Sequence, residues 1–191
     1  MKDKVILTDC DGVLLDWEYG FATYMKDRFG LTPIRNDVYS VGDTYGITKA
    51  KGREYVRIYN ESAAIGSLTP FRDAKKYVTK IYEELGYVFH CITSLSTDRH
   101  AGELRRKNLE TVFGKGVFEK IVCLECGADK DEALEEYRDT GCLWVEDKYL
   151  NCEAGEKVGL DPILIHHSHN KDMKTPYKTV MNWREIYESL I

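Results

Sequence analysis

Five short runs of apolar residues along the chain predict buried strands. They are residues 4–9 (KVILTD), 87–93 (YVFHCIT), 120–124 (KIVCL), 142–146 (CLWVE) and 162–166 (PILIH). Continuous apolar runs of this length are typical of strands that are covered on both faces, as in a parallel sheet. Helical patterns separate the runs, so the chain is predicted to form an α/β fold with right-handed crossovers.

Amphipathic segments between these runs predict the covering helices. In residues 72–86, apolar side chains recur at helical spacing and a glycine follows the last of them, as at many helix ends (Ala74, Tyr77, Val78, Ile81, Leu85 and Gly86). Residues 98–114 and 129–139 are richer in charge and predict amphipathic surface helices.

The alternation of strands and helices is interrupted between residues 17 and 70. This stretch has helical patterns near 19–29 and 48–62, a polar loop between them, many tyrosines and no buried strand. We therefore expect a Rossmann-like core domain made of residues 1–16 and 71–191. Residues 17–70 would form a small, mainly helical cap inserted after the first core strand and packed over the strand ends.

Composition excludes several classes of function. The 191 residues carry a formal net charge of −5, whereas a general nucleic-acid binder needs a basic surface, so no nucleic-acid polymer is expected as a partner. No apolar run approaches the ~20 residues of a membrane span, so no membrane partner is expected either. The first strand begins almost at the N-terminus, which argues against a signal peptide.

Six cysteines bear on the compartment and on metal binding. Four of them lie in predicted buried strands or directly after one, which suits small, reduced, apolar side chains and predicts a cytoplasmic protein. Cys123 and Cys126 have the spacing of half a zinc site, but no second such pair completes a tetrahedral set. A structural zinc ion is therefore not expected.

Polar side chains gather where the predicted strands end. They are Asp9 and Asp11 after the first strand, Thr93 and Ser94 after the second, Lys130 beyond the third, and Glu146 and Asp147 after the fourth. The carboxyl ends of parallel strands meet at one edge of the sheet, so these groups are expected to share one crevice. Two neighbouring carboxylates repel each other, which requires a compensating metal ion or cationic side chain. Acids, a hydroxyl group and an amine together suit phosphoryl transfer to a carboxylate nucleophile.

These residues, in this order, resemble the four motifs of the haloacid dehalogenase (HAD) superfamily. The motif residues are Asp9-Cys10-Asp11-Gly12-Val13, Thr93, Lys130 and the acidic pair Glu146-Asp147, and the resemblance spans residues 5 to about 155. The stretch DGVLLDW followed by a helical cap, and CITS after it, also resembles the 5′(3′)-deoxyribonucleotidase branch. That branch usually has two aspartates where this chain has Glu146 and Asp147.

The resemblance implies a role for each catalytic position. Asp9 would attack phosphorus and form an aspartyl-phosphate. Asp11 would protonate the leaving oxygen and then accept a proton from the hydrolytic water. Thr93 would donate a hydrogen bond to a phosphoryl oxygen, and Lys130 would neutralise charge on Asp9 and on the phosphoryl group.

The resemblance also implies a magnesium site and substrate contacts. Mg²⁺ would be held by the Asp9 carboxylate, the Asp11 backbone carbonyl and Asp147, with Glu146 and Asn151 behind them. Ser94 and Lys148 are further candidates for contact with the phosphate. Trp17 either stacks on a nucleobase or belongs, with Phe21 and Tyr24, to the apolar core of the cap; both interpretations stay open.

The expected activity is a Mg²⁺-dependent phosphomonoesterase acting on a small phosphorylated metabolite, with a nucleoside monophosphate favoured. A phosphosugar phosphatase is the nearest alternative. A receiver-like or non-catalytic phosphate-binding protein is the alternative from another class, although receivers carry their acceptor aspartate on the third strand, which here has none. Dehalogenase chemistry needs no acid two residues after the nucleophile and is not favoured. The histidine-rich segment 166–170 (HHSHN) is predicted to be a polar loop.

Overall fold

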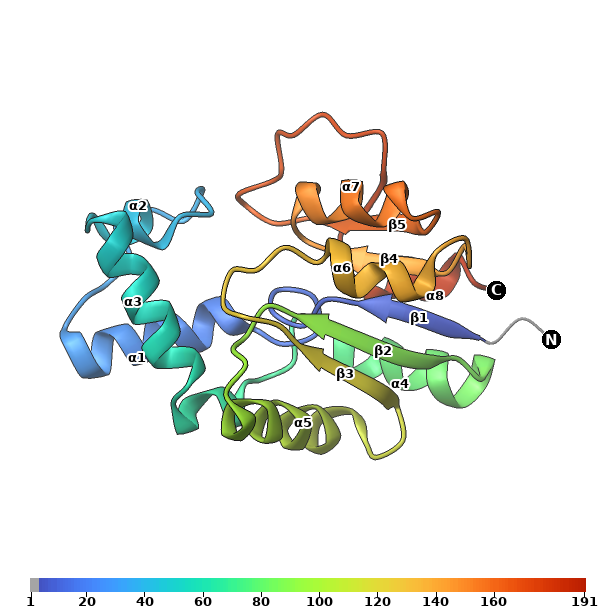
Figure 1. Ribbon diagram of the computed structural model, residues 1–191, viewed down its shortest axis with the longest axis horizontal. Coiled ribbons are helices and arrows are strands. Elements are labelled where there is room, and N and C mark those ends of the chain that lie inside the picture. Colours follow the sequence, from blue (N-terminus) through green and yellow to red (C-terminus); the bar gives the residue numbers. More distant parts are fainter. Residues whose placement is uncertain (1–3) are drawn as a thin grey trace.

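The computed structural model describes residues 4–191 and contains one six-stranded parallel sheet. The strands are β1 (Val5–Thr8), β2 (Val88–Thr93), β3 (Phe118–Cys123), β4 (Leu143–Glu146), β5 (Asp161–Ile165) and β6 (Lys178–Val180). Their order is β3-β2-β1-β4-β5-β6, and all neighbours are parallel. The order reverses direction at β1, so the carboxyl ends of β1, β2 and β4 flank the topological switch point (Figure 1).

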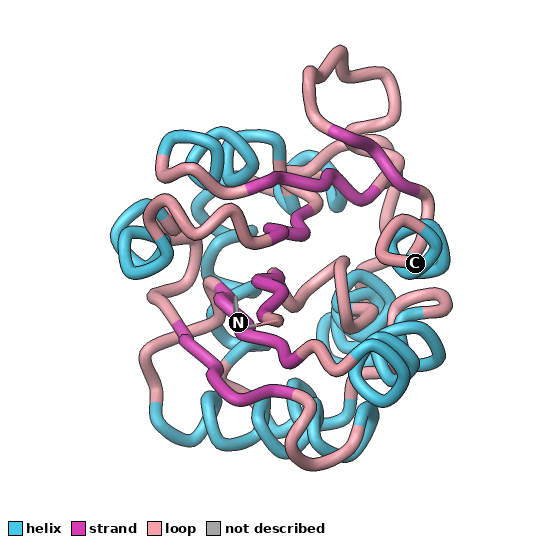
Figure 2. Tube along the Cα trace, turned by 90° about the vertical axis from the view of Figure 1, so that its right-hand side faces the viewer, coloured by secondary structure: helices cyan, strands magenta, loops and turns pink. Residues whose placement is uncertain are grey.

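Helices cover both faces of this sheet, as the continuous apolar strands require (Figure 2). One face carries α4 (Ala74–Leu85), α5 (Arg99–Phe113) and α8 (Trp183–Glu188), packed on Ile6, Phe89 and Val145. The other carries α6 (Asp131–Leu134), the 3₁₀ turn η2 (Glu135–Tyr137) and α7 (Tyr149–Lys157), packed on Leu7, Ile92 and Trp144. Successive strand residues point to opposite faces, so each strand fills both cores.

The segment between β1 and β2 begins with four helical elements beyond the carboxyl edge of the sheet (Figure 1). They are α1 (Trp17–Phe29), α2 (Val41–Tyr45), α3 (Lys49–Asn60) and the 3₁₀ helix η1 (Ala63–Ser67). An aromatic cluster holds them together, with Phe21 stacked on Trp17 at 4.5 Å and in edge contact with Tyr45 and Tyr59. The helical insertion predicted after the first strand is therefore present.

The fold class and the five predicted strands are confirmed, whereas several details differ. The sequence did not predict β6, a three-residue edge strand without an apolar run. The helix predicted over 129–139 is only α6 followed by a 3₁₀ turn, because its charged residues leave few apolar positions. The predicted surface helix over 98–114 is α5, but it buries Arg105 and Asn108 completely or nearly so. The domain boundaries stay a prediction, and residues 1–3 of the predicted core lie outside the described residues.

Candidate active site

The loop after β1 positions both aspartates of the opening motif. Asp9 continues the strand, and its backbone N–H donates to the carbonyl of Val145 in β4 at 2.9 Å. Gly12 then turns the chain with φ of 77°, a left-handed conformation that favours glycine. A Cβ at Gly12 would lie 3.0 Å from Asp147 Oδ2 and 3.2 Å from His167 Cε1, so a side chain there would crowd the site.

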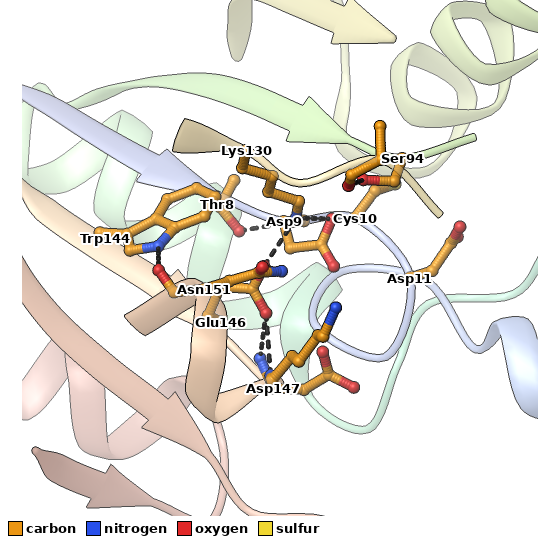
Figure 3. A network of polar contacts seen from close by, with 12 residues as sticks. Thr8, Asp9, Cys10, Asp11, Ser94, Lys130, Trp144, Glu146, Asp147 and Asn151 are labelled. Atoms are coloured by element: carbon orange, nitrogen blue, oxygen red, sulfur yellow. Dashed lines mark hydrogen bonds and ion pairs between the residues drawn. The ribbon is translucent and has the colours of Figure 1, made fainter. Parts of the chain in front are cut away.

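Lys130 lies between two buried carboxylates at the centre of the site (Figure 3). Its ammonium group is 2.7 Å from Asp9 Oδ1 and 2.6 Å from Glu146 Oε1. Burial lowers the pKa of Lys130, but the two facing carboxylates raise it above that of an ordinary lysine. The lysine is therefore charged, and its position at the start of α6 brings that charge directly to Asp9.

Glu146 has no oxygen to spare for a metal ion. Its Oε1 accepts from Lys130 and from Asn151 Nδ2, both at 2.6 Å, and its Oε2 accepts from the backbone N–H groups of Asp147 and Lys148 at 2.8 and 2.9 Å. Burial raises the pKa of Glu146, but the Lys130 contact outweighs it and the net pKa is lowered. Glu146 is an ionised anchor that fixes Lys130 and Asn151.

The donor set at the strand ends fits a divalent cation. Carboxylate oxygens of Asp9, Glu146 and Asp147 lie within 4.8 Å of one another. Burial, opposed by Lys130, raises the pKa of Asp9 to about 7, and burial together with Glu146 and Asp9 raises that of Asp147 well above its usual range. Three buried carboxylates face one ammonium group, and a cation held by Asp9 and Asp147 would compensate the remaining charge.

Asp11 occupies a different environment from Asp9. The fully buried guanidinium of Arg105, in α5, contacts Asp11 Oδ1 at 2.7 Å and Oδ2 at 2.9 Å, and also donates to Cys10 Sγ at 3.2 Å. Burial raises the pKa of Asp11, and Arg105 only partly opposes that rise. Sequence reasoning missed Arg105, because an arginine on a charged helix ordinarily faces solvent.

The remaining candidates for phosphate contact also line the site. Thr93 is buried at the end of β2, and Ser94 donates its hydroxyl proton to the carbonyl of Ala128 at 2.8 Å. Lys148 follows Asp147, and its ammonium lies 5.9 Å from the ring centre of Tyr39. The structure thus brings the sequence-predicted site residues to the wall of one cavity of about 530 Å³, except Glu146, which is fully buried.

Trp17 belongs both to the cap core and to the wall of this cavity. Its ring stacks on Phe21, and its Nε1 donates to Asn60 Oδ1 at 2.9 Å. Phe21 is buried in the aromatic cluster, and the ring centre of Tyr24 lies 5.1 Å from that of Tyr59, as expected of cap-core residues. The two interpretations of Trp17 therefore do not exclude each other.

The histidine-rich segment is a loop, as predicted, but the sequence did not predict that His167 is buried in it. His167 is buried, stacks on Phe71 at 4.7 Å and bonds the carbonyl of Gly12 through Nε2 at 2.6 Å. Burial lowers the pKa of His167 to about 4, so the ring is neutral. His169 lines the cavity, 3.7 Å from Asp147 Oδ2. The loop folds back because Asn170 bonds the carbonyls of Asp147 and Ile165.

No family model matches the sequence. One curated relative, an uncharacterised 32.4 kDa protein of the Gp30–rIII intergenic region of Enterobacteria phage T4, is 24% identical over 97% of this chain and 69% of its own length. That relative supplies no function.

Solved structures share the fold over the whole chain. A haloacid dehalogenase-like hydrolase from Streptococcus pneumoniae matches with a TM-score of 0.68 and 14% sequence identity. A predicted phosphatase from Clostridium acetobutylicum matches with a TM-score of 0.66 and 15% identity. Each match covers 100% of this chain and 99% of the other protein. A magnesium-bound HAD-hydrolase from Bacillus subtilis matches with a TM-score of 0.60 and 15% identity, over the same shares of the two chains. L-2-haloacid dehalogenases are also among the similar structures. The chain therefore has the fold of the HAD-like hydrolases.

Proposed function

We propose that this protein is a Mg²⁺-dependent phosphomonoesterase that works through an aspartyl-phosphate. The observation that carries the proposal is the contrast between two aspartates on one turn. Asp9 faces Lys130 at 2.7 Å and lies beside Asp147, whereas Asp11 faces Arg105. The Asp9 carboxyl lies where Lys130 and the proposed Mg²⁺ would compensate its charge for attack, whereas the Asp11 carboxyl is held apart by Arg105 and is left for proton transfer.

The proposed reaction has two steps. An Asp9 oxygen attacks phosphorus, and the bond from phosphorus to the ester oxygen breaks as Asp11 donates its proton to that oxygen. Water then attacks the aspartyl-phosphate, with Asp11 accepting its proton, and inorganic phosphate leaves with Asp9 regenerated. Lys130 neutralises charge on Asp9 and on the phosphoryl oxygens, and Thr93 donates a hydrogen bond to one of those oxygens.

Asp9, the Asp11 backbone carbonyl and Asp147 would hold the magnesium ion. When bound, Mg²⁺ supplies positive charge that lowers the pKa of Asp9 and stabilises the phosphoryl oxygens. A B. subtilis protein of the same fold is bound to magnesium, which supports the choice of this metal. Glu146 contributes through Lys130 and Asn151, since its own oxygens are occupied.

A nucleoside monophosphate is the proposed substrate, with a phosphosugar as the alternative. The support is Trp17, which presents an indole to the cavity and whose orientation is fixed by Asn60. Base stacking on an aromatic side chain contributes ~1–3 kcal/mol, enough to favour a nucleotide over a sugar phosphate.

Dehalogenase chemistry is the second candidate because L-2-haloacid dehalogenases share the fold. It needs no acid two residues beyond the nucleophile, whereas Asp11 is present and has its own buried partner. Asp11 and Arg105 therefore favour phosphate ester hydrolysis.

Phosphate release from nucleotides, phosphosugars and p-nitrophenyl phosphate, each with Mg²⁺ and with excess chelator, tests the proposal. We expect turnover that requires Mg²⁺ and is greatest with nucleotides. Chloride release from 2-chloropropionate, without phosphate release from any ester, would overturn it in favour of a dehalogenase.

A cytoplasmic location is part of the proposal and is supported by the cysteines, which are all free thiols. Among residues 4–191, every helix is too short or too polar to cross a lipid bilayer.

A further inference from the structure

The cap helix α3 turns a basic face toward the cavity. Lys49, Arg53 and Arg57 are spaced four residues apart, so they lie on one side of the helix, and all three line the cavity wall. At ~1.5 Å of rise per residue they extend over roughly 12 Å of that wall. Figure 1 shows α3 beyond the carboxyl ends of strands β1, β2 and β3.

Two of these cations have no partner within the described residues. Arg57 pairs with Glu61 at 2.9 Å, but Lys49 and Arg53 form no ion pair in the described part of the chain. Other charges of α3 balance each other outside the cavity, where Lys51 pairs with Glu54 at 3.0 Å. The uncompensated charge therefore lies specifically on the cavity face.

This basic face contrasts with the rest of the protein. The chain has a formal net charge of −5, and the floor of the cavity carries the buried carboxylates of Asp9 and Asp147. On that floor, Lys130 and the proposed Mg²⁺ would already neutralise the charge of the scissile phosphate. Lys49 and Arg53 are exposed side chains that the chemical step does not need, and their place on the cavity wall leaves both cations free to bind a second anion.

We infer that Lys49 and Arg53 form a subsite for a second phosphate group, so that the substrate is a small bisphosphorylated metabolite. This inference rests on the proposed phosphomonoesterase activity, and it replaces the nucleoside monophosphate or phosphosugar proposed above with the corresponding bisphosphate. Arginine and lysine are the side chains best suited to phosphate, and the guanidinium can bind it through two parallel hydrogen bonds. A cavity of about 530 Å³ suits a small molecule. A nucleoside bisphosphate and a sugar bisphosphate both supply the required chemistry.

The test compares matched substrates on matched variants. Nucleoside 3′,5′-bisphosphate is compared with nucleoside 5′-monophosphate, and fructose 1,6-bisphosphate with fructose 6-phosphate. The variant is Lys49→Gln/Arg53→Gln, and the control is Lys26→Gln/Lys51→Gln. The control removes the same charge from exposed cap positions outside the cavity.

We expect the wild-type protein to prefer a bisphosphate over the matched monophosphate. The pair of substrates that shows this preference tells whether the substrate is a nucleotide or a sugar phosphate. The cavity variant should raise KM for that bisphosphate about tenfold or more, with kcat changed less than twofold. KM of the cavity variant for the monophosphate should change less than twofold. KM of the control variant should also change less than twofold with either substrate. Equal losses on bisphosphate and monophosphate, or no wild-type preference, would overturn the inference.

Direct binding separates this inference from the proposed function. If the wild-type protein releases phosphate from no ester, including p-nitrophenyl phosphate with Mg²⁺, the proposed function fails. Calorimetric titration of the same bisphosphates into wild type and the two variants then decides the subsite. Binding weakened about tenfold only in Lys49→Gln/Arg53→Gln supports it, whereas equal binding by all three proteins contradicts it.

Discussion

Arg105, fully buried in α5, contacts both carboxylate oxygens of Asp11, at 2.7 and 2.9 Å. A side chain of core helix α5 thus pairs with Asp11, while the ammonium group of Lys130 lies 2.7 Å from Asp9 Oδ1. The two carboxylates, two residues apart in the sequence, consequently have separate cationic partners. This separation is the structural basis for assigning them different roles.

Removing Arg105 should cost much more stability than removing an exposed arginine of the same helix. Arg105→Met leaves the Asp11 carboxylate, which is 21% exposed, without its counter-charge. Breaking a fully buried pair typically costs about 3–5 kcal/mol, and we expect a loss toward the lower end of that range. Arg99 pairs with Glu103 at 2.9 Å, but its side chain is 92% exposed, so Arg99→Met should cost less than about 1 kcal/mol. Urea unfolding measures both. Combining Arg105→Met with Asp11→Asn should recover part of the loss; strictly additive losses would contradict a direct coupling.

Asp9 and Asp11 should differ sharply in their kinetics. Asp9→Asn should abolish turnover, because an amide is a poor nucleophile. Asp11→Asn should slow alkyl phosphates far more than activated aryl phosphates, whose leaving groups need no proton. A phosphoenzyme should accumulate in Asp11→Asn, since no base activates water. Acid-quench trapping of labelled protein checks this; label on Asp11, or near-normal turnover by Asp9→Asn, would reverse the assignment.

Metal affinity should distinguish Asp147 from Glu146. Asp147→Asn removes a proposed ligand and should weaken Mg²⁺ binding more than 100-fold. Glu146→Gln acts only through Lys130 and Asn151 and should weaken it about 10- to 100-fold. Mg²⁺ titrations of phosphate release, and of the midpoint of thermal unfolding, give the two affinities. A larger effect from Glu146→Gln would make Glu146 the direct ligand.

Trp17 should matter specifically for substrates that carry a base. Trp17→Ala should raise KM for nucleoside monophosphates about tenfold, as expected from lost stacking, and should change KM for a sugar phosphate much less. Phe21→Ala is the control, because Phe21 packs on Trp17 in the cap core and does not line the cavity. Its effect should be the same on both substrates. Equal effects of Trp17→Ala on both would leave Trp17 with a packing role alone.

Neutral His167 should make the protein less stable in acid. Burial lowers its pKa in the folded protein to about 4, whereas the unfolded chain keeps the ordinary value of 6.5. The unfolded state therefore binds more protons below pH 6.5, and stability is lost as the pH falls from about 6.5 toward 4. The loss should approach about 3 kcal/mol for this group. Unfolding of wild type and His167→Gln at pH 7 and pH 5 checks the sign; the variant should lose less stability on acidification.

The sequence by itself determined the fold class and most of the proposed catalytic and metal-binding residues. Runs such as 87–93 are mainly apolar without alternation, a pattern typical of a strand buried on both faces. Parallel strands necessarily bring their carboxyl ends together, so Asp9, Thr93 and Asp147 could be placed in one crevice from chain order alone. Lys130 could be chosen from its position after the third strand.

Only the tertiary structure decided the partners of these groups. Arg105 and His167 carry no local signal, because exposed and buried versions of such residues look alike in a sequence. The four-residue spacing of Lys49, Arg53 and Arg57 places them on one side of a helix, but only the tertiary structure turns that side toward the cavity. Their burial or orientation depends on which helix packs where, as when α5 brings Arg105 to Asp11 and the loop after β5 brings His167 to Gly12. The ion pair between Arg105 and Asp11 joins residues 94 positions apart, and the hydrogen bond between His167 and the Gly12 carbonyl joins residues 155 positions apart. Packing brings them together, and periodicity along the chain does not encode it.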